Sequence, residues 1–318
     1  MKIEQIIQGL KDKDYSVLAK AITLIESKLK EEQVKAQKLL KQISKDQLIS
    51  SPTVTIGISG PPGVGKSSFI EKFGTDLLEH DTKLCMAVLT IDPSSNKVGG
   101  SILGDKTRMD KLTKNQRAFI RPSPSSPYTG GLHKNTFDVI QLCRFFSFDY
   151  IFLESVGVGQ VEVEIEHFVD YVWLLMQPGS GDELQSIKKG ILEIAEVFVL
   201  NKFDGQFENK VIELEKDLSL SFGQMKDLFK FSAFKDGMSE KLIHYLLEKK
   251  NGDFQSRVEL RKKNMLNIFN SYVSYLLLDE FLHGEKTAKL RQKVITDLRS
   301  HPDQFWLEAN QFKKKLLT

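Results

Sequence analysis

The sequence has few of the residues that form disulfides, bind soft metals or span membranes. It contains two cysteines and six histidines among 318 residues. We expect Cys85 in a strand and Cys143 in a helix, where each would be a packing residue in a reducing compartment. Every apolar run falls short of the roughly 20 residues that a bilayer-spanning helix needs. Charged residues interrupt the first positions, which does not fit a signal peptide, so we expect a cytoplasmic protein with no membrane segment.

The sequence also lacks an excess of either charge. Its 45 basic and 42 acidic residues give a formal net charge of +3. The basic residues are scattered, and no basic run is interleaved with aromatic residues. We therefore expect neither nucleic acid nor an anionic membrane as a partner. With 41% hydrophobic residues, the chain can build one large domain with appendages or two domains.

The chain is organised around the glycine-rich stretch at residues 60–67. This stretch, GPPGVGKS, has the phosphate-binding pattern of Gly, four residues, then Gly-Lys-Ser. It lies between an expected strand at 54–58 and an expected helix at 68–78. Such a loop directs backbone N–H groups at phosphate oxygens, and the helix N-terminus adds positive partial charge. We expect these residues to bind nucleotide phosphates: Gly60, Pro62, Gly63, Val64, Gly65, Lys66, Ser67 and Ser68.

Strands and helices alternate through the middle of the chain, which predicts an α/β fold with a mostly parallel sheet. The expected strands are 54–58, 83–91, 116–121, 150–153, 171–176, 197–200 and 230–232. In such a sheet, ligands bind beyond the carboxyl ends of the strands. We predict a P-loop NTPase domain over residues 51–250, with a helical extension at 1–50 and a helical arm at 251–318.

Both ends of the chain have helical periodicity. In the N-terminal extension, Asp14 could cap a helix whose apolar face runs from Val17 to Leu29. We favour packing of this extension on the main domain over a partner-binding arm. In the C-terminal arm, residues 275–282 are apolar nearly all round, whereas a surface helix needs only one apolar stripe. We therefore favour contact with another subunit over intramolecular packing.

Acidic residues follow two of the expected strands. Asp92 comes directly after the second strand, and Asp105 lies in the glycine-containing segment that follows it. Glu154 ends the fourth strand, three residues before Gly157, which has the form of the second NTPase signature. Carboxylate oxygens are ligands that Mg²⁺ prefers. We expect Asp92, Asp105 and Glu154 to join Ser67 at Mg²⁺, and the Gly157 N–H to contact the γ-phosphate.

A third motif points to guanine. Asn201-Lys202-Phe203-Asp204 follows the strand at 197–200, and the Asp204 carboxylate could accept hydrogen bonds from both the N1–H and the 2-amino group of guanine. Lys202 would lie over the ring. Ser232 and Ala233 would place a backbone N–H near the guanine O6.

The glycine-rich stretch at 178–190 has two interpretations, and residue spacing does not distinguish between them. Asp182 could simply cap a helix. Alternatively, the stretch could be a third mobile segment that brings Gln185 or Lys188 to the nucleotide.

Together these segments resemble the MeaB/ArgK-type P-loop GTPases, companions of adenosylcobalamin-dependent acyl-CoA mutases such as methylmalonyl-CoA mutase. The resemblance runs from about residue 8 to 250 and rests on GISGPPGVGKSS, TIDPSSNKVGGSILGDKTRM, AFIRPSPSS, ESVGVGQVE, MQPGSGDELQSIKKGI and NKFDG. It implies a GTP-binding and GTP-hydrolysing chaperone that acts on cofactor loading, gating or protection of the mutase. It also implies a homodimer formed through the C-terminal helices.

By motif position, the resemblance implies catalytic roles for Lys66, Asp92, Glu154 and Lys188, and metal roles for Ser67, Asp92, Asp105 and Glu154. Residues 178–190 match the third switch of the family. The sequence departs from the family pattern at 127–133, where bulkier residues flank Gly130 and Gly131.

Two other functions remain as alternatives. A GTP- or ATP-dependent kinase needs an acceptor pocket with a base near the γ-phosphate, and no motif here marks one. A metal-delivery GTPase of the hydrogenase or urease maturation kind needs soft or imidazole ligands. The small number of cysteines and histidines disfavours that reading.

Overall fold

The computed structural model describes residues 1–27, 29–43, 48–92, 109–124, 134–155, 164–177, 189–203, 212 and 227–300. These divide into two compact units, Met1–Met265 and Leu266–Thr318. The three-part division predicted from the sequence stays a prediction.

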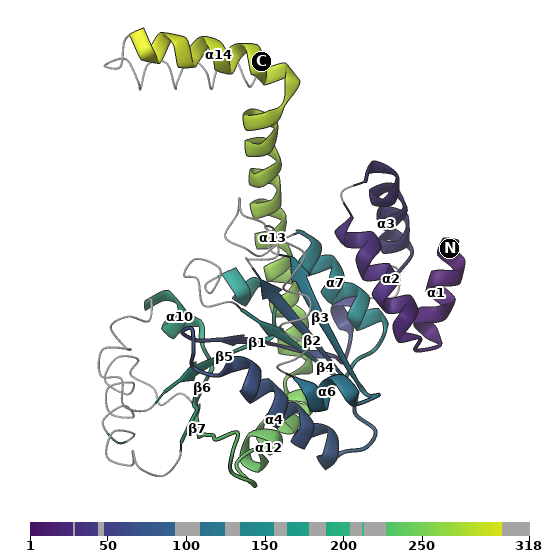
Figure 1. The fold of residues 1–318 in the computed structure, drawn as a ribbon, viewed down its shortest axis with the longest axis vertical. Coiled ribbons are helices and arrows are strands. Elements are labelled where there is room, and N and C mark those ends of the chain that lie inside the picture. Colours follow the sequence, from purple (N-terminus) through teal and green to yellow (C-terminus); the bar gives the residue numbers. More distant parts are fainter. Residues whose placement is uncertain are drawn as a thin grey trace. The chain divides into compact units, whose positions relative to one another are not determined.

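A seven-stranded parallel sheet lies at the centre of the first unit (Figure 1). The strands are β1 (Val54–Ser59), β2 (Met86–Asp92), β3 (Ala118–Pro124), β4 (Tyr150–Glu154), β5 (Tyr171–Met176), β6 (Val197–Leu200) and β7 (Asp227–Lys230). Their order across the sheet is β3-β2-β4-β1-β5-β6-β7, and all neighbours pair in parallel. The predicted α/β fold is therefore confirmed.

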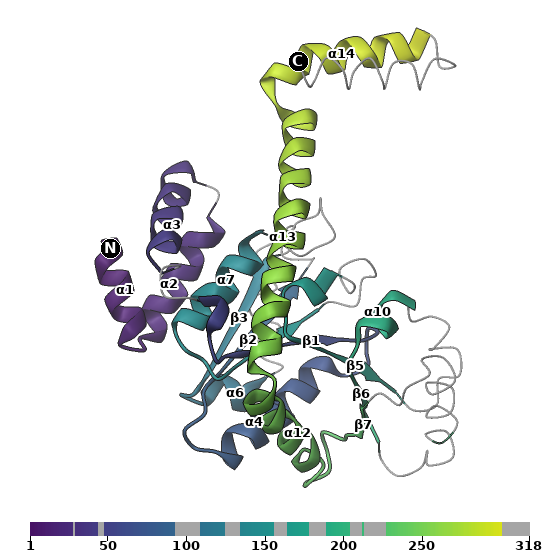
Figure 2. The same cartoon turned by 180° about the vertical axis from the view of Figure 1, so that it is seen from behind.

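Helices cover both faces of the sheet, as the two opposite views show (Figure 1, Figure 2). One apolar cluster joins α4 (Lys66–His80), α6 (Asp110–Lys114) and α12 (Glu240–Gly252) to one face of the strands. A second joins α7 (Lys134–Phe145) and α10 (Lys189–Ile194) to the other face. Side chains alternate between the two clusters along β4, because successive strand residues point to opposite faces. The strands are buried on both faces, which explains their nearly continuous apolar runs.

The N-terminal helices α1 (Ile3–Lys11), α2 (Tyr15–Glu26) and α3 (Lys30–Ile43) share the apolar cluster of α7. This confirms packing on the main domain. The Asp14 carboxylate accepts hydrogen bonds from the backbone N–H groups of Ser16 and Val17, which confirms the predicted cap. The prediction that Leu29 belongs to the buried face of this helix is wrong. Helix α2 ends at Glu26, because the backbone of Ser27 is extended. Leu29 lies at the start of α3, where its side chain is 65% exposed.

Three strands differ from the sequence predictions by more than one residue. The β2 strand begins at Met86, so the prediction that Cys85 lies in a strand is wrong; the Cys85 N–H is donated to the Asp149 carboxylate. The β3 strand continues through Pro122 and Pro124, which an edge strand tolerates because one side needs no N–H donors. The β7 strand spans Asp227–Lys230 instead of 230–232. Cys143 lies in α7 as predicted and is buried, and both cysteines are free.

Two long helices complete the described chain, α13 (Phe254–His283) and α14 (Glu285–Ser300). The first residues of α13 belong to the first unit, and its residues from Leu266 onward belong to the second. Several large apolar side chains of α13 are exposed: Met265, Leu266, Phe269, Leu276, Leu277 and Leu278. No described helix is both long enough and apolar enough to cross a membrane.

Candidate nucleotide-binding site

The phosphate loop, residues 60–67, joins β1 to α4 and is shaped by glycines at two crowded positions. Gly60 has a φ of 144°, and a Cβ there would lie 2.5 Å from the Leu175 carbonyl oxygen. Gly65 has a φ of 95°, and a Cβ there would lie 2.7 Å from the Asn201 amide nitrogen. Both positions combine left-handed backbone with close packing, so only glycine fits them. Gly65 is also the N-cap of α4, which points the helix N-terminus at the loop.

The Lys66 ammonium is hydrogen-bonded to the first residues of this loop. Its Nζ donates to the carbonyl oxygens of Gly60 at 2.6 Å and Pro61 at 3.2 Å, and the residue is 8% exposed. Both acceptors are neutral. An anionic phosphate oxygen at the same place would form a stronger, charge-assisted hydrogen bond. The predicted phosphate-binding lysine is therefore held against the phosphate loop.

Ser67 and Glu154 lie in direct contact. The Ser67 hydroxyl donates to Glu154 Oε1 at 2.7 Å, although 87 residues separate them in the chain. Glu154 ends β4, whose pairing with β1 places it opposite Ile58, just before the phosphate loop. The following residue, Ser155, is buried and donates both its N–H and its hydroxyl to the Ile58 carbonyl. The structure thus brings together Ser67 and one of the three carboxylates predicted to bind Mg²⁺.

Asp92 leaves the sheet at the same edge. It is the last residue of β2, and two positions earlier Thr90 pairs with Glu154 of β4. Because β2 and β4 are parallel neighbours, Asp92 and Glu154 both lie at the carboxyl ends of their strands. The backbone of Asp92 is described, but its side chain lies outside the described part of the chain.

Two of the predicted base-reading residues, Asn201 and Lys202, are hydrogen-bonded to the phosphate loop. Asn201 follows β6, and its side-chain amide donates to the carbonyl oxygens of Val64 at 2.8 Å and Gly65 at 3.3 Å. Lys202 has a φ of 59°, and its Nζ donates to the Gly63 carbonyl at 2.8 Å. Two segments that are far apart in the sequence therefore lie in direct contact.

The Ser232-Ala233 turn is fixed beside these residues. Phe231 donates its N–H to the Leu200 carbonyl and accepts from the Phe203 N–H. Its ring packs at 4.7 Å between centroids against Phe69 of α4, the helix that begins at the phosphate loop. Ser232 is completely buried. The turn is thus attached to both the base-reading loop and the phosphate-loop helix.

Several predicted site residues lie outside the described residues: Asp105, Gly157, Asp182, Gln185, Lys188 and Asp204, together with the unusual stretch at 127–133. Their assignments stay predictions, and so do both readings of residues 178–190.

Gln177 was not among the residues predicted from the sequence, and the structure places it beside Lys202. It directly follows β5, and its Oε1 accepts a hydrogen bond from Lys202 Nζ at 3.3 Å. The signal was available, because Gln177 is a polar residue directly after a buried strand, like Asn201 after β6.

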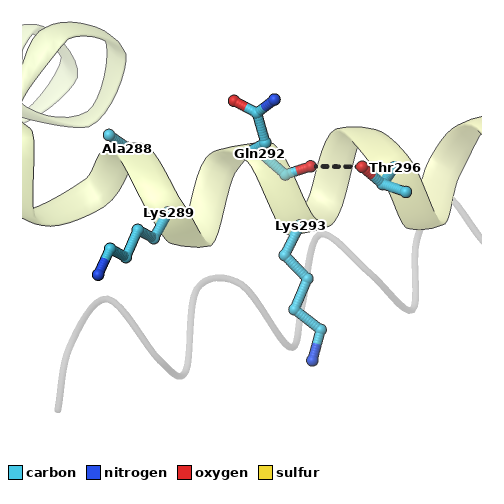
Figure 3. A pocket seen from close by; sticks show the side chains of 5 residues that line it. All are labelled: Ala288, Lys289, Gln292, Lys293 and Thr296. Carbon is cyan, nitrogen blue, oxygen red and sulfur yellow. Dashed lines mark hydrogen bonds between the residues drawn. The ribbon is translucent and has the colours of Figure 1, made fainter.

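A separate pocket lies along α14 (Figure 3). Its described lining is Ala288, Lys289, Gln292, Lys293 and Thr296. The Thr296 hydroxyl donates to the Gln292 carbonyl of the same helix at 2.9 Å. None of these residues belongs to the phosphate or base-reading loops, so this pocket is not part of the candidate site.

Comparison with known proteins gives one family. The family described as "Methylmalonyl Co-A mutase-associated GTPase MeaB" matches residues 18–240. The GTPase ArgK of Escherichia coli is 35% identical over 309 residues, covering 96% of this chain and 82% of that protein. A Caulobacter vibrioides protein with the description "Putative GTPase" is 45% identical over 204 residues, covering 64% of this chain. The chain spans only 61% of the length of that relative.

Among solved structures, a crystal structure titled "LAO/AO transport system kinase" is similar with a TM-score of 0.75. The match covers 99% of this chain and 98% of that chain at 24% identity. At that identity the likeness supports the fold alone.

Proposed function

Because the chain belongs to the methylmalonyl-CoA mutase-associated GTPase family, we propose that it binds GTP with Mg²⁺ and hydrolyses it to GDP and phosphate. We propose further that this cycle regulates cofactor loading, gating or protection of an adenosylcobalamin-dependent acyl-CoA mutase. The observation that carries the proposal is the attachment of Asn201 and Lys202 to the phosphate loop. It supports a site where one nucleotide contacts a phosphate-binding motif and a base-reading motif together.

Phosphate binding follows from the loop and Lys66. On binding, the Lys66 ammonium would exchange its neutral carbonyl partners for β- and γ-phosphate oxygens. Backbone N–H groups at the start of α4 would supply further donors, and the helix dipole would favour the negative charge. These groups would stabilise the phosphates in the ground state and in the transition state.

The residues at the phosphate loop also fit Mg²⁺. Ser67 Oγ and the Glu154 carboxylate, 2.7 Å apart, are hard oxygen donors of the kind that this ion prefers. Ser67 would be a direct ligand, Glu154 would act through a bound water, and Asp92 and Asp105 would complete the set. The ion would neutralise charge that develops on the phosphate oxygens. Within the protein, the Ser67 hydroxyl would give up its hydrogen bond to Glu154 and free that carboxylate to orient water.

Guanine selectivity would come from Asp204, whose carboxylate can pair with both guanine donors. Lys202 would lie over the ring, and the turn at Ser232 and Ala233 would offer a backbone N–H to O6. The fixed position of this turn beside Phe203 supports the assignment.

The proposal of a mutase partner is based on the family, and the proposal of a homodimer is based on the family and on the exposed apolar surface of α13. Leu266, Phe269 and Leu277 of α13 are 61%, 61% and 62% exposed. Exposed apolar surface of this kind marks interaction sites, and we propose that α13 pairs with a second copy of the chain. Residues 178–190 would carry the nucleotide signal to the mutase. The cytoplasmic location stays a prediction.

One titration series with activity measurements tests the proposal. The full chain should bind a fluorescent GDP analogue, GTP should displace it, and ATP should not. Steady-state phosphate release should require Mg²⁺ and should increase when a cobalamin-dependent mutase is added. Lys66→Ala is the control that should lose phosphate affinity. Equal displacement by ATP and GTP would refute guanine selectivity, and transfer of labelled phosphate to an acceptor other than water would favour the kinase alternative.

A further inference from the structure

Lys202 is held by two other segments of the chain at once. Its Nζ donates to the Gly63 carbonyl of the phosphate loop at 2.8 Å and to Gln177 Oε1 at 3.3 Å. Its backbone has a φ of 59°, a left-handed conformation that is uncommon for residues other than glycine. A conformation of this kind persists where the surroundings fix it. The position of this lysine is therefore set by contacts outside its own loop.

The sheet places Gln177 next to Lys202. Met176, the last residue of β5, pairs with Leu200, the last residue of β6. The Asn201 N–H donates to the Met176 carbonyl at 2.8 Å, which extends this pairing by one step. Gln177 therefore lies one residue past the end of β5, and Lys202 lies two residues past the end of β6, at the same edge of the sheet. Because the buried strands β5 and β6 set the distance between Gln177 and Lys202, their hydrogen bond does not depend on the path of a long loop.

The chemistry of the contact matters for a nucleotide base. Both described acceptors of the Lys202 ammonium, the Gly63 carbonyl and the Gln177 amide, are neutral. They orient the ammonium without cancelling its charge. A long, flexible lysine side chain loses considerable rotamer freedom when it is ordered, and fixing it before the ligand arrives removes that cost from binding. A positive charge held over the face of a purine is attracted by its π-system.

We propose that Gln177 is a positioning residue that holds the Lys202 side chain over the face of the nucleotide base. The proposal rests on the guanine-nucleotide function proposed above. Gln177 would act through Lys202, not by reading a base edge. Its effect should therefore be the same for guanine and xanthine nucleotides, unlike the effect of Asp204.

The test compares two replacements of similar length. Gln177→Met keeps the shape of the side chain and removes the acceptor, whereas Gln177→Glu keeps an acceptor. In titrations of the full chain with a fluorescent GDP analogue, Gln177→Met should raise Kd about fivefold, the scale of one partly exposed hydrogen bond to a charged group. Gln177→Glu should also raise Kd, because the negative charge of its carboxylate would cancel part of the positive charge that attracts the base. In steady-state assays the loss should appear in KM for GTP more than in kcat.

A double-mutant cycle separates positioning from a structural effect. In a Lys202→Ala background, Gln177→Met should cause no further loss of GDP affinity. A fivefold loss in both backgrounds, or wild-type affinity of Gln177→Met alone, would overturn the proposal. Gln177→Ala offers a second variant without the acceptor if Gln177→Met does not fold. If the wild type binds no guanine nucleotide, the proposed function itself is wrong. Binding by the wild type with no coupling in the cycle would refute only the role of Gln177.

Discussion

The strongest prediction about stability concerns Arg261, a buried arginine of α13 in the first unit. Its guanidinium forms two hydrogen bonds of 2.6 Å to the two Asp170 carboxylate oxygens. It also donates to the backbone carbonyl oxygens of Ile49, Ser51 and Thr53, at 2.8, 2.8 and 2.5 Å. The side chains of Arg261 and Asp170 are 5% and 0% exposed. This ion pair fastens α13 to the start of β5 and to the segment that leads into β1.

Breaking the pair should be costly because the remaining charge stays buried. Loss of one partner of a buried ion pair costs about 3–5 kcal/mol. Arg261→Met also leaves three backbone carbonyls without this donor, so we expect a loss at the upper end of that range. Asp170→Asn should cost at least as much, because Arg144 lies 3.8 Å from the same carboxylate. Burial lowers the pKa of Arg144 to about 10, and repulsion by Arg261 and Arg257 acts in the same direction. The Asp170 carboxylate opposes this shift, so Asp170→Asn would remove the charge that stabilises the Arg144 cation.

Equilibrium urea unfolding of the full chain measures these losses, with the buried Trp173 of β5 as a fluorescent reporter. The control is Lys262→Met, one residue along the same helix. Lys262 pairs with Glu259 at 2.8 Å, but their side chains are 55% and 59% exposed. Solvent screening should keep that loss below about 0.5 kcal/mol. If Arg261→Met and Asp170→Asn unfold within about 1 kcal/mol of the wild type at an unchanged m-value, the argument from burial is refuted.

Three further predictions concern the nucleotide site. Asp204→Asn should weaken GTP and favour xanthosine triphosphate by about 100-fold in relative affinity, as measured by competition, because the amide can no longer accept from both guanine donors. Asp92→Ala should lower kcat at least about tenfold with a smaller change in GTP binding, and titration with Mg²⁺ should not restore the rate; wild-type turnover would reject the assignment. Lys188→Ala should remove most of the mutase-stimulated GTPase rate, a loss of about 100-fold if one cationic donor acts on the transition state. Equal stimulation of variant and wild type would exclude that role for Lys188.

Much of the fold could be predicted because the relevant signals are local. The strands are buried on both faces and therefore appear as short apolar runs. The Asp14 cap could be predicted because its hydrogen bonds reach only two and three residues along the chain. The phosphate loop could be predicted because its glycines occupy positions with positive φ that other residues rarely adopt. The predicted strand boundaries were less accurate. The end of β3 was missed because its prolines fit only an edge strand, and the sequence does not show which strand lies at the edge.

The missed residues depend on strand order and on distant partners. Arg261 has the sequence pattern of an ordinary charged helix residue, and its partner Asp170 lies 91 residues away. Gln177 becomes a site residue only because β5 and β6 are neighbours in the sheet. The signal of a polar residue at a strand end was applied to Asp92, Glu154 and Asn201, and the structure places Glu154 and Asn201 in contact with the phosphate loop. It would have identified Gln177 if it had been applied to every strand.

The strand order also explains how one loop can serve both halves of a nucleotide. The β1 strand, which leads into the phosphate loop, lies between β4 and β5, and β6 follows β5. Glu154 from the β4 side contacts Ser67, while Asn201 and Lys202 from the β6 side contact Val64 and Gly63. The residues predicted to bind metal and base thus approach the phosphate loop from opposite sides of β1. Because both sets are bonded to the same few loop residues, a change in the loop at Gly65 should disturb phosphate binding and base recognition together. A substitution of Asn201 should first disturb the β6 side of the loop, and a substitution of Glu154 should first disturb the β4 side. Either disturbance should reach the opposite side only through this loop.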